Sequence, residues 1–176
     1  MHLHFSNQIT INAPATKVWR VLAHEFASIG QWVSAIPHSQ AVTDIPAPDG
    51  AQVAGRVCAT ALPGFDAVRE QFTYYDEQAM RFAYQATDGR PFFIKRAENH
   101  LAVRSLGPET SMVESRAELD VSLFPGVFLA PLLKLLIGRV AAQFSEELKY
   151  YVEHDQPHPR KLKAQSKQMQ KAATRS

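Results

Sequence analysis

A strand that passes directly into a helix near the start of the chain is the strongest constraint on the fold. Residues 3–12 alternate imperfectly between apolar and polar side chains and end in β-branched residues, which is typical of a strand. Pro14 follows, and its fixed φ suits the first turn of a helix. The next apolar residues repeat at helical spacing: Val18, Val21, Leu22 and Phe26. A second short helical turn is predicted from Ser28 to Val33, so two short helices follow the first strand.

A longer helix is predicted near the other end of the chain, at residues 131–153. Its apolar residues are three or four positions apart and therefore share one face: Leu133, Ile137, Val140, Phe144, Leu148 and Tyr151. At about 1.5 Å per residue this helix is about 35 Å long, which is enough to cross a small sheet.

The residues between the two helical regions read as consecutive strands with turns between them. The predicted strands are residues 40–45, 52–62, 67–75, 80–86, 93–106 and 111–123. The turns carry proline, glycine or aspartate: Pro46 to Gly50, Pro63-Gly64, Asp76 to Gln78, Asp88 to Pro91, and Gly107-Pro108. Such short connections indicate antiparallel neighbours. We therefore expect an α+β fold, in which a curved seven-stranded antiparallel sheet wraps around the long C-terminal helix.

Charge divides the chain into two parts. Residues 1–155 contain 13 Lys and Arg against 17 Asp and Glu, whereas residues 156–176 contain six basic side chains and no acidic one. We expect one ligand-binding domain over 1–155 and a basic tail over 156–176 that is disordered or only partly helical, because Pro157 and Pro159 oppose continuation of the helix. The tail is either a solvated terminus or a weak contact for an anionic membrane. Nucleic acid is not an expected partner, since no aromatic residues interleave the basic ones. The oligomeric state is left open.

No cofactor or metal is expected from the motifs. The sequence has no glycine-rich phosphate loop, no GxSxG and no HExxH. His2 and His4 share a strand face, but two histidines alone do not make a metal site. Cys58 is the only cysteine, which excludes an intramolecular disulfide, and it is expected to be a small buried residue. No signal peptide is visible at the start, so a cytoplasmic location is expected.

The chain resembles the START-related helix-grip superfamily, in its polyketide cyclase/dehydrase and lipid-transport-like branch. The resemblance is carried by ITINAPATKVW with FASIGQW, by GRVCATALPGFDAVREQFTYYDEQAMRFAY, and by EELKYYVE, in the family's order across nearly all of residues 3–154. It implies a seven-stranded sheet that grips the C-terminal helix around a hydrophobic ligand cavity. No short catalytic motif defines the superfamily, so the resemblance leaves the chemistry open.

One segment is more apolar than covering a sheet requires. Residues 123–138, LFPGVFLAPLLKLLIG, contain two prolines and a lysine and make a poor membrane span. They form either a hydrophobic entrance or lid, or a part of the core to which Phe124, Val127, Phe128 and Leu129 contribute.

Glu70 is the candidate acid or base. It lies in a predicted strand among Val68, Phe72 and Tyr74, which share a face if the strand alternates regularly. If that face looks inward, desolvation of Glu70 favours its protonated form and permits proton transfer. The alternative is that Glu70 lies at the rim or outside, paired with an arginine such as Arg56, Arg69 or Arg81.

Further residues are expected to line the cavity. On the strand at 111–123 the small set Val113, Ser115, Ala117 and Leu119 should look inward and leave room. The predicted ligand-binding residues are Trp32, Val68, Phe72, Tyr74, Phe82, Tyr84, Asn99, Ser115, Ala117, Phe128, Leu133, Ile137, Val140 and Phe144. His100 is a further polar candidate.

Three classes of function compete. The first is a carrier or sensor that binds a lipid-like or polycyclic molecule. The second is a cyclase or dehydratase in which Glu70, with Tyr74 or His100, moves protons. The third is an interaction protein that meets a membrane surface through its basic tail and apolar entrance. The sequence does not decide whether the protein is an enzyme.

Overall fold

The computed structural model describes residues 1–60 and 67–173, with side chains described throughout these ranges except at 123–134, 171 and 172. The elements follow in the order β1 (His2–Ile11), α1 (Ala15–Trp19), the π-helical turn η1 (Arg20–His24), the 3₁₀ turn η2 (Phe26–Gln31), β2 (Ser39–Ala41), β3 (Gly55–Ala59), β4 (Ala67–Asp76), β5 (Arg81–Asp88), β6 (Ile94–Gly107), β7 (Thr110–Val121), α2 (Leu123–His154) and α3 (Pro159–Ala173). The predicted turn at Pro63-Gly64 lies outside the described residues.

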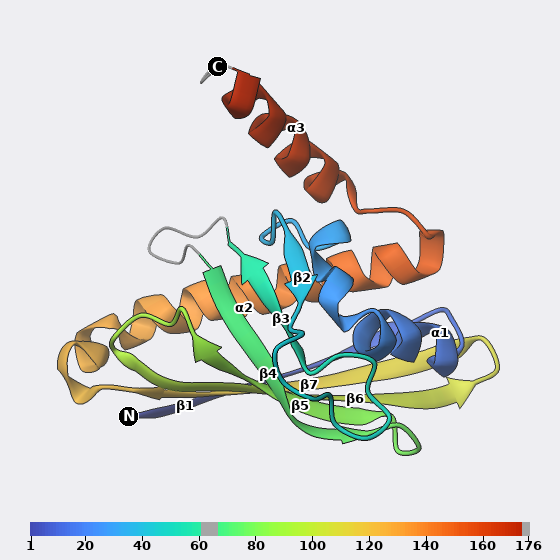
Figure 1. Ribbon diagram of the computed structural model, residues 1–176, viewed down its shortest axis with the longest axis horizontal. Coiled ribbons are helices and arrows are strands. Elements are labelled where there is room, and N and C mark those ends of the chain that lie inside the picture. The colour runs from blue at the N-terminus through green and yellow to red at the C-terminus, as the bar shows by residue number, and fades with distance from the viewer. Residues whose placement is uncertain (61–66, 174–176) are drawn as a thin grey trace.

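The strands form a single seven-stranded antiparallel sheet in the order β1-β7-β6-β5-β4-β3-β2. Consecutive strands from β2 to β7 pair with one another, and β1 pairs with β7. Figure 1 shows the twisted sheet with α2 running across it. The predicted α+β helix-grip architecture is confirmed. The edge strand β2 is shorter than the predicted 40–45.

Helix α2 begins at Leu123, eight residues before the predicted start. Pro125 is compatible with this earlier start, because it falls in the first turn, where backbone N–H groups have no partner within the helix. The predicted lid at 123–138 is therefore helical backbone. The choice between lid and core concerns the side chains of Phe124, Val127, Phe128 and Leu129, which lie outside the described ones.

The basic tail, which was expected to be disordered or only partly helical, forms a helix. α3 covers Pro159–Ala173 and extends away from the sheet (Figure 1). Its first turn is anchored, because the buried Lys161 donates through Nζ to the backbone oxygen of Ile36 at 2.7 Å. Arg160 pairs there with Glu146 and Glu147. The composition of the tail predicts solvated lysines, whereas Lys161 is buried and binds the backbone of Ile36.

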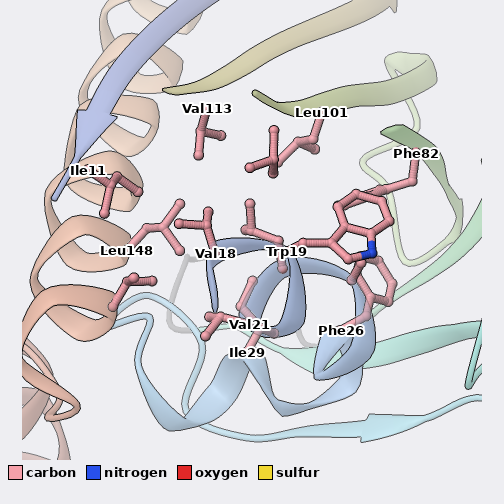
Figure 2. Packing of buried hydrophobic residues seen from close by; sticks show 14 of the residues in the cluster. Ile11, Val18, Trp19, Val21, Phe26, Ile29, Phe82, Leu101, Val113 and Leu148 are labelled. Carbon is pink, nitrogen blue, oxygen red and sulfur yellow. The ribbon is translucent and has the colours of Figure 1, made fainter. Parts of the chain in front are cut away.

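The core fills only one part of the concave side. Figure 2 shows side chains of the helical segment after β1 meeting those of the sheet and Leu148 of α2. Trp19 lies 5.6 Å from Phe82 between ring centroids, and Phe26 lies 5.8 Å from Phe82 and 4.3 Å from Phe72. Trp19, Phe26, Phe72 and Phe82 fill one end of the space between the sheet and α2, and we call them the aromatic plug. The rest of that space is a cavity.

Candidate functional site

A cavity of about 530 Å³ lies between the concave face of the sheet and α2. Its walls come from β1, from η2 and the loop after it, from β3 to β7, and from α2. The apolar wall includes Phe5, Ile29, Val33, Ile36, Val68, Leu101, Ile137, Val140 and Phe144. A space of this size and composition is typical of a site for a small organic ligand.

Small residues on the sheet create the space. Along one row of cross-strand partners, Tyr84 on β5 faces Asn99 on β6, which faces Ala117 on β7 and then Phe5 on β1. Ser115 occupies the next inward position of β7. Of the set on β7 that was predicted to look inward, Val113 is buried and Ser115 and Ala117 line the cavity, whereas Leu119 is only partly buried and is not part of the described lining.

A buried ion pair lies at the β3–β4 side of the cavity. Nε of Arg56 donates to Oε2 of Glu70 at 2.6 Å, and the two residues are direct partners across β3 and β4. Gly55 permits the backbones of β3 and β4 to approach closely beside this pair, because a Cβ at residue 55 would stand 2.1 Å from the backbone oxygen of Glu70. Both predictions for Glu70 hold in part: the side chain faces the cavity, and it is paired with Arg56.

The surroundings of Arg56 hold its guanidinium in place. Nη1 donates to the backbone oxygen of Phe26 at 3.1 Å, and Cζ lies 3.9 Å from the ring centroid of Phe26 and 5.0 Å from that of Tyr84. Burial is the largest influence and lowers the pKa of Arg56, but the charge and hydrogen bond of Glu70, with smaller contributions from Tyr84 and Cys58, together outweigh it and hold this pKa above its ordinary value. Arg56 is therefore a permanent cation in the wall.

Two neighbouring groups stay protonated near neutral pH. Burial raises the pKa of Cys58 to about 11, against the opposing charge of Arg56. Burial, together with the charge of Glu70, also raises the pKa of Tyr84. The thiol and the phenol are thus neutral hydrogen-bonding groups, and neither is a ready nucleophile.

A second polar group borders the cavity beneath α2. The buried Glu147 accepts hydrogen bonds from the backbone N–H of Ser34 at 2.8 Å and from its hydroxyl at 2.6 Å. Arg160 of α3 donates to the same carboxylate at 3.0 Å. Nearby, Nδ2 of Asn7 donates to Oγ of Ser145 at 2.6 Å. The cavity thus has polar groups on its sheet wall and on its helix wall.

Many of the residues named from the sequence border this cavity. They are Val68, Glu70, Tyr84, Asn99, Ser115, Ala117, Ile137, Val140 and Phe144. The side chains of Phe128 and Leu133 lie outside the described ones.

Other predicted residues lie elsewhere. Phe72 and Phe82 belong to the aromatic plug, and the buried Trp32 packs against Phe144 and Tyr151 behind the cavity wall. Tyr74 points away: its side chain is 52% exposed and its hydroxyl donates to Asp76 at 3.1 Å. A bulge between Phe72 and Tyr74 shifts the alternation by one residue and turns Tyr75 inward instead.

His100 also faces away from the cavity, because it follows the inward Asn99 on β6. On the convex face it forms, with Glu98 and Glu118, a group whose side-chain ligand atoms lie within 4.8 Å of one another. Both carboxylates are already paired, Glu98 with Arg96 and Glu118 with Arg116. This group works as an ion-pair network on the sheet.

Sequence reasoning named Arg56 as one of three possible partners of Glu70, and the cross-strand register selects it. It missed the polar residues on the helix side of the cavity. Nothing local marks Ser34 and Glu147, which come from a loop and a helix 113 residues apart.

Comparison with known sequences agrees with this geometry. A sequence model of the family described as polyketide cyclase/dehydrase and lipid transport matches residues 2–153. The chain belongs to this family. No curated protein sequence matches it significantly.

Several solved structures share the fold of this polyketide cyclase/dehydrase and lipid transport family member. A START superfamily protein from Mycobacterium smegmatis superposes with a TM-score of 0.70 at 17% identity, over 87% of this chain and 98% of that one. The Zhui aromatase/cyclase from Streptomyces sp. R1128 gives 0.66 at 14% identity, over 90% and 100%. Norcoclaurine synthase from Thalictrum flavum, solved in complex with dopamine and hydroxybenzaldehyde, gives 0.61 at 15% identity, over 83% and 86%. At these identities the likeness shows the fold alone. In the described part of this family member, no helix has the length and apolarity needed to cross a membrane.

Proposed function

We propose that the protein binds one small hydrophobic molecule in the cavity between the sheet and α2, as a carrier or a sensor. The observation that carries this proposal is the cavity of about 530 Å³ with a largely apolar wall. Ligand sites in proteins commonly have volumes of about 300–1,000 Å³ and few polar groups. The complex of norcoclaurine synthase with dopamine and hydroxybenzaldehyde supports the view that this fold accepts small aromatic molecules.

In this proposal the apolar body of the ligand packs between the sheet and the helix. Val68 on β4 and Ile137, Val140 and Phe144 on α2 supply apolar contacts, and Ala117 provides the space opposite them. Burial of ligand surface contributes about 25 cal/mol per Å² before the costs of association.

Titration with N-phenyl-1-naphthylamine, a neutral fluorescent probe, tests this proposal. We expect saturable binding at one site, and native mass spectrometry of the purified protein should show a retained hydrophobic molecule. The variant Ala117→Phe fills the cavity and should abolish binding of the probe. Ala102→Phe makes the same change on the convex face of the adjacent strand and should bind normally. If neither binding nor a retained molecule is found, the protein is not a carrier.

A second candidate function is catalysis of the cyclase or dehydratase kind. The observation that favours it is that the Glu70 carboxylate faces an apolar cavity beside Arg56 and the protonated phenol of Tyr84. The likeness to an aromatase/cyclase is consistent with such a use. Incubation with a poly-β-ketone chain should then give a cyclised product, and Glu70→Gln should lose turnover while retaining probe binding. Unchanged turnover in this variant would rule out Glu70 as the acid or base.

Contact with an anionic membrane is a third candidate, and α3 is the feature that favours it. Its exposed side chains include Leu162 and Met169 together with Lys163 and Lys167. Removal of residues 162–176 spares the anchors Arg160 and Lys161. This truncation should abolish co-sedimentation with phosphatidylserine vesicles, and binding of the full chain should weaken with salt. Equal sedimentation of both proteins would exclude α3 as the contact.

A further inference from the structure

The guanidinium of Arg56 is held by its neighbours and is barely accessible from the cavity. Its Nε is bound to Glu70, its Nη1 to the backbone oxygen of Phe26, and its flat faces lie against the rings of Phe26 and Tyr84. The residue is only 5% exposed. Its accessible surface is therefore small and its charge is already paired with Glu70, so it is a poor receptor for a carboxylate on the ligand.

Glu70 has an unused oxygen. Only Oε2 receives a hydrogen bond from Arg56, and Oε1 makes none to any residue in the described ranges. The side chain is 18% exposed and lies in the cavity wall. An ionised carboxylate oxygen is solely an acceptor, so its complement on a ligand is a hydrogen-bond donor.

The charges of the cavity wall also favour a ligand that donates a hydrogen bond over one that carries a carboxylate. Among the described residues that line the cavity, only Arg56, Glu70 and Glu147 are charged, giving one cation and two carboxylates. Both oxygens of Glu147 are taken, one by Ser34 alone and the other by Ser34 and Arg160. A carboxylate ligand would therefore meet two like charges and a single cation that is only 5% exposed and already paired with one of them.

We propose that the ligand is a hydrophobic molecule with a hydroxyl or protonated amine, and that this group donates to Oε1 of Glu70. Free carboxylic acids, including fatty acids, are rejected. The amide of Asn99, which has no hydrogen bond to a described residue, offers a second polar contact in the wall. This inference rests on the proposed ligand-binding function and narrows its ligand class.

A set of four ligands with the same naphthalene body tests the inference on the unmodified protein. The ligands are 1-naphthalenemethanol, 1-naphthylmethylamine, 1-methoxynaphthalene and 1-naphthoate, each competing with N-phenyl-1-naphthylamine. The alcohol and the amine should bind about tenfold or more tightly than the ether, since hydrogen bonds to a charged group are strong, and naphthoate should bind most weakly.

The outcomes separate the two proposals. Equal binding of ether and alcohol, or preferred binding of naphthoate, would overturn this inference and leave the binding function standing. Failure of the probe itself to bind would overturn both.

A matched pair of variants then assigns the effect to Glu70. Glu70→Gln should reduce amine binding about tenfold or more and leave the ether unchanged. Glu118→Gln is the control, because Glu118 also lies on a strand, 2.6 Å from an arginine and 15% exposed, but on the convex face. If both variants keep the amine preference, Glu70 is not its receptor. Should Glu70→Gln fail to fold, the four ligands on the unmodified protein still decide the inference.

Discussion

Arg160 of α3 donates through Nη1 to Oε1 of Glu147 at 3.0 Å, and Glu147 is itself part of the cavity wall. The same carboxylate receives two hydrogen bonds from Ser34, in the loop after η2. One buried acid therefore joins α2, this loop and α3. The position of α3 is tied to the site rather than independent of it.

Loss of this contact should loosen α3. Arg160→Ala leaves Ser34 as the hydrogen-bond partner of the buried Glu147 among the described residues and should lower the free energy of unfolding by about 1–3 kcal/mol. Hydrogen exchange of the α3 amides should become faster, because the helix loses an anchor. Lys167→Ala, at an exposed position of the same helix, should change neither quantity. Unaltered exchange in Arg160→Ala would show that the contact does not hold α3.

Removal of the buried cation should be more severe. Arg56→Met leaves Glu70 unpaired in the cavity wall, and we expect a loss of about 3–5 kcal/mol in urea unfolding. The double variant Arg56→Met with Glu70→Leu should recover most of this loss, since no lone charge remains. Arg69→Met breaks the pair with Asp44, whose side chain is 65% exposed, and should cost about 1 kcal/mol or less. A double variant no more stable than Arg56→Met would argue against a penalty from the lone carboxylate.

The sequence predicted the sheet well because each turn carries its own chemical signal. Glycine, proline and aspartate mark the connections, and short connections leave antiparallel pairing as the simple solution. The bulge after Phe72 has no such mark, since neither glycine nor proline occurs there, and Tyr74 was therefore placed on the wrong face.

The site was harder to predict than the sheet. Cross-strand register puts Arg56 opposite Glu70, but the depth of that pair depends on Phe26, which packs over the guanidinium from a distant segment. Glu147 is bound to Ser34 by tertiary packing alone. Likewise, the sequence around Lys161 predicts a solvated side chain, whereas its hydrogen bond to Ile36 holds the first turn of α3 in place.

The aromatic plug should contribute strongly to stability. Phe82 is 2% exposed and packs against Trp19, Phe26 and Phe72. Phe82→Ala should cost about 3–5 kcal/mol in urea unfolding, because the deleted ring leaves a void among rigid neighbours. Phe92→Ala makes the same change at a side chain that is 88% exposed and should stay within about 0.5 kcal/mol of the unmodified protein. Similar losses in the two variants would contradict the description of the plug as core.

Cys58 should make the protein less stable at alkaline pH. Burial raises the pKa of its thiol from 9.0 to about 11, so between these values the folded protein holds a proton that the unfolded chain has released. Stability therefore falls as pH rises through this window, by about 3 kcal/mol for two pH units. Cys58→Ala should lack this decline when urea unfolding is followed from pH 8 to 11. Other groups, including Tyr84, titrate in both proteins and largely cancel in the difference. Val57→Ala retains the thiol and should decline as the unmodified protein does, while parallel curves for all three proteins would show that the thiol does not carry the effect.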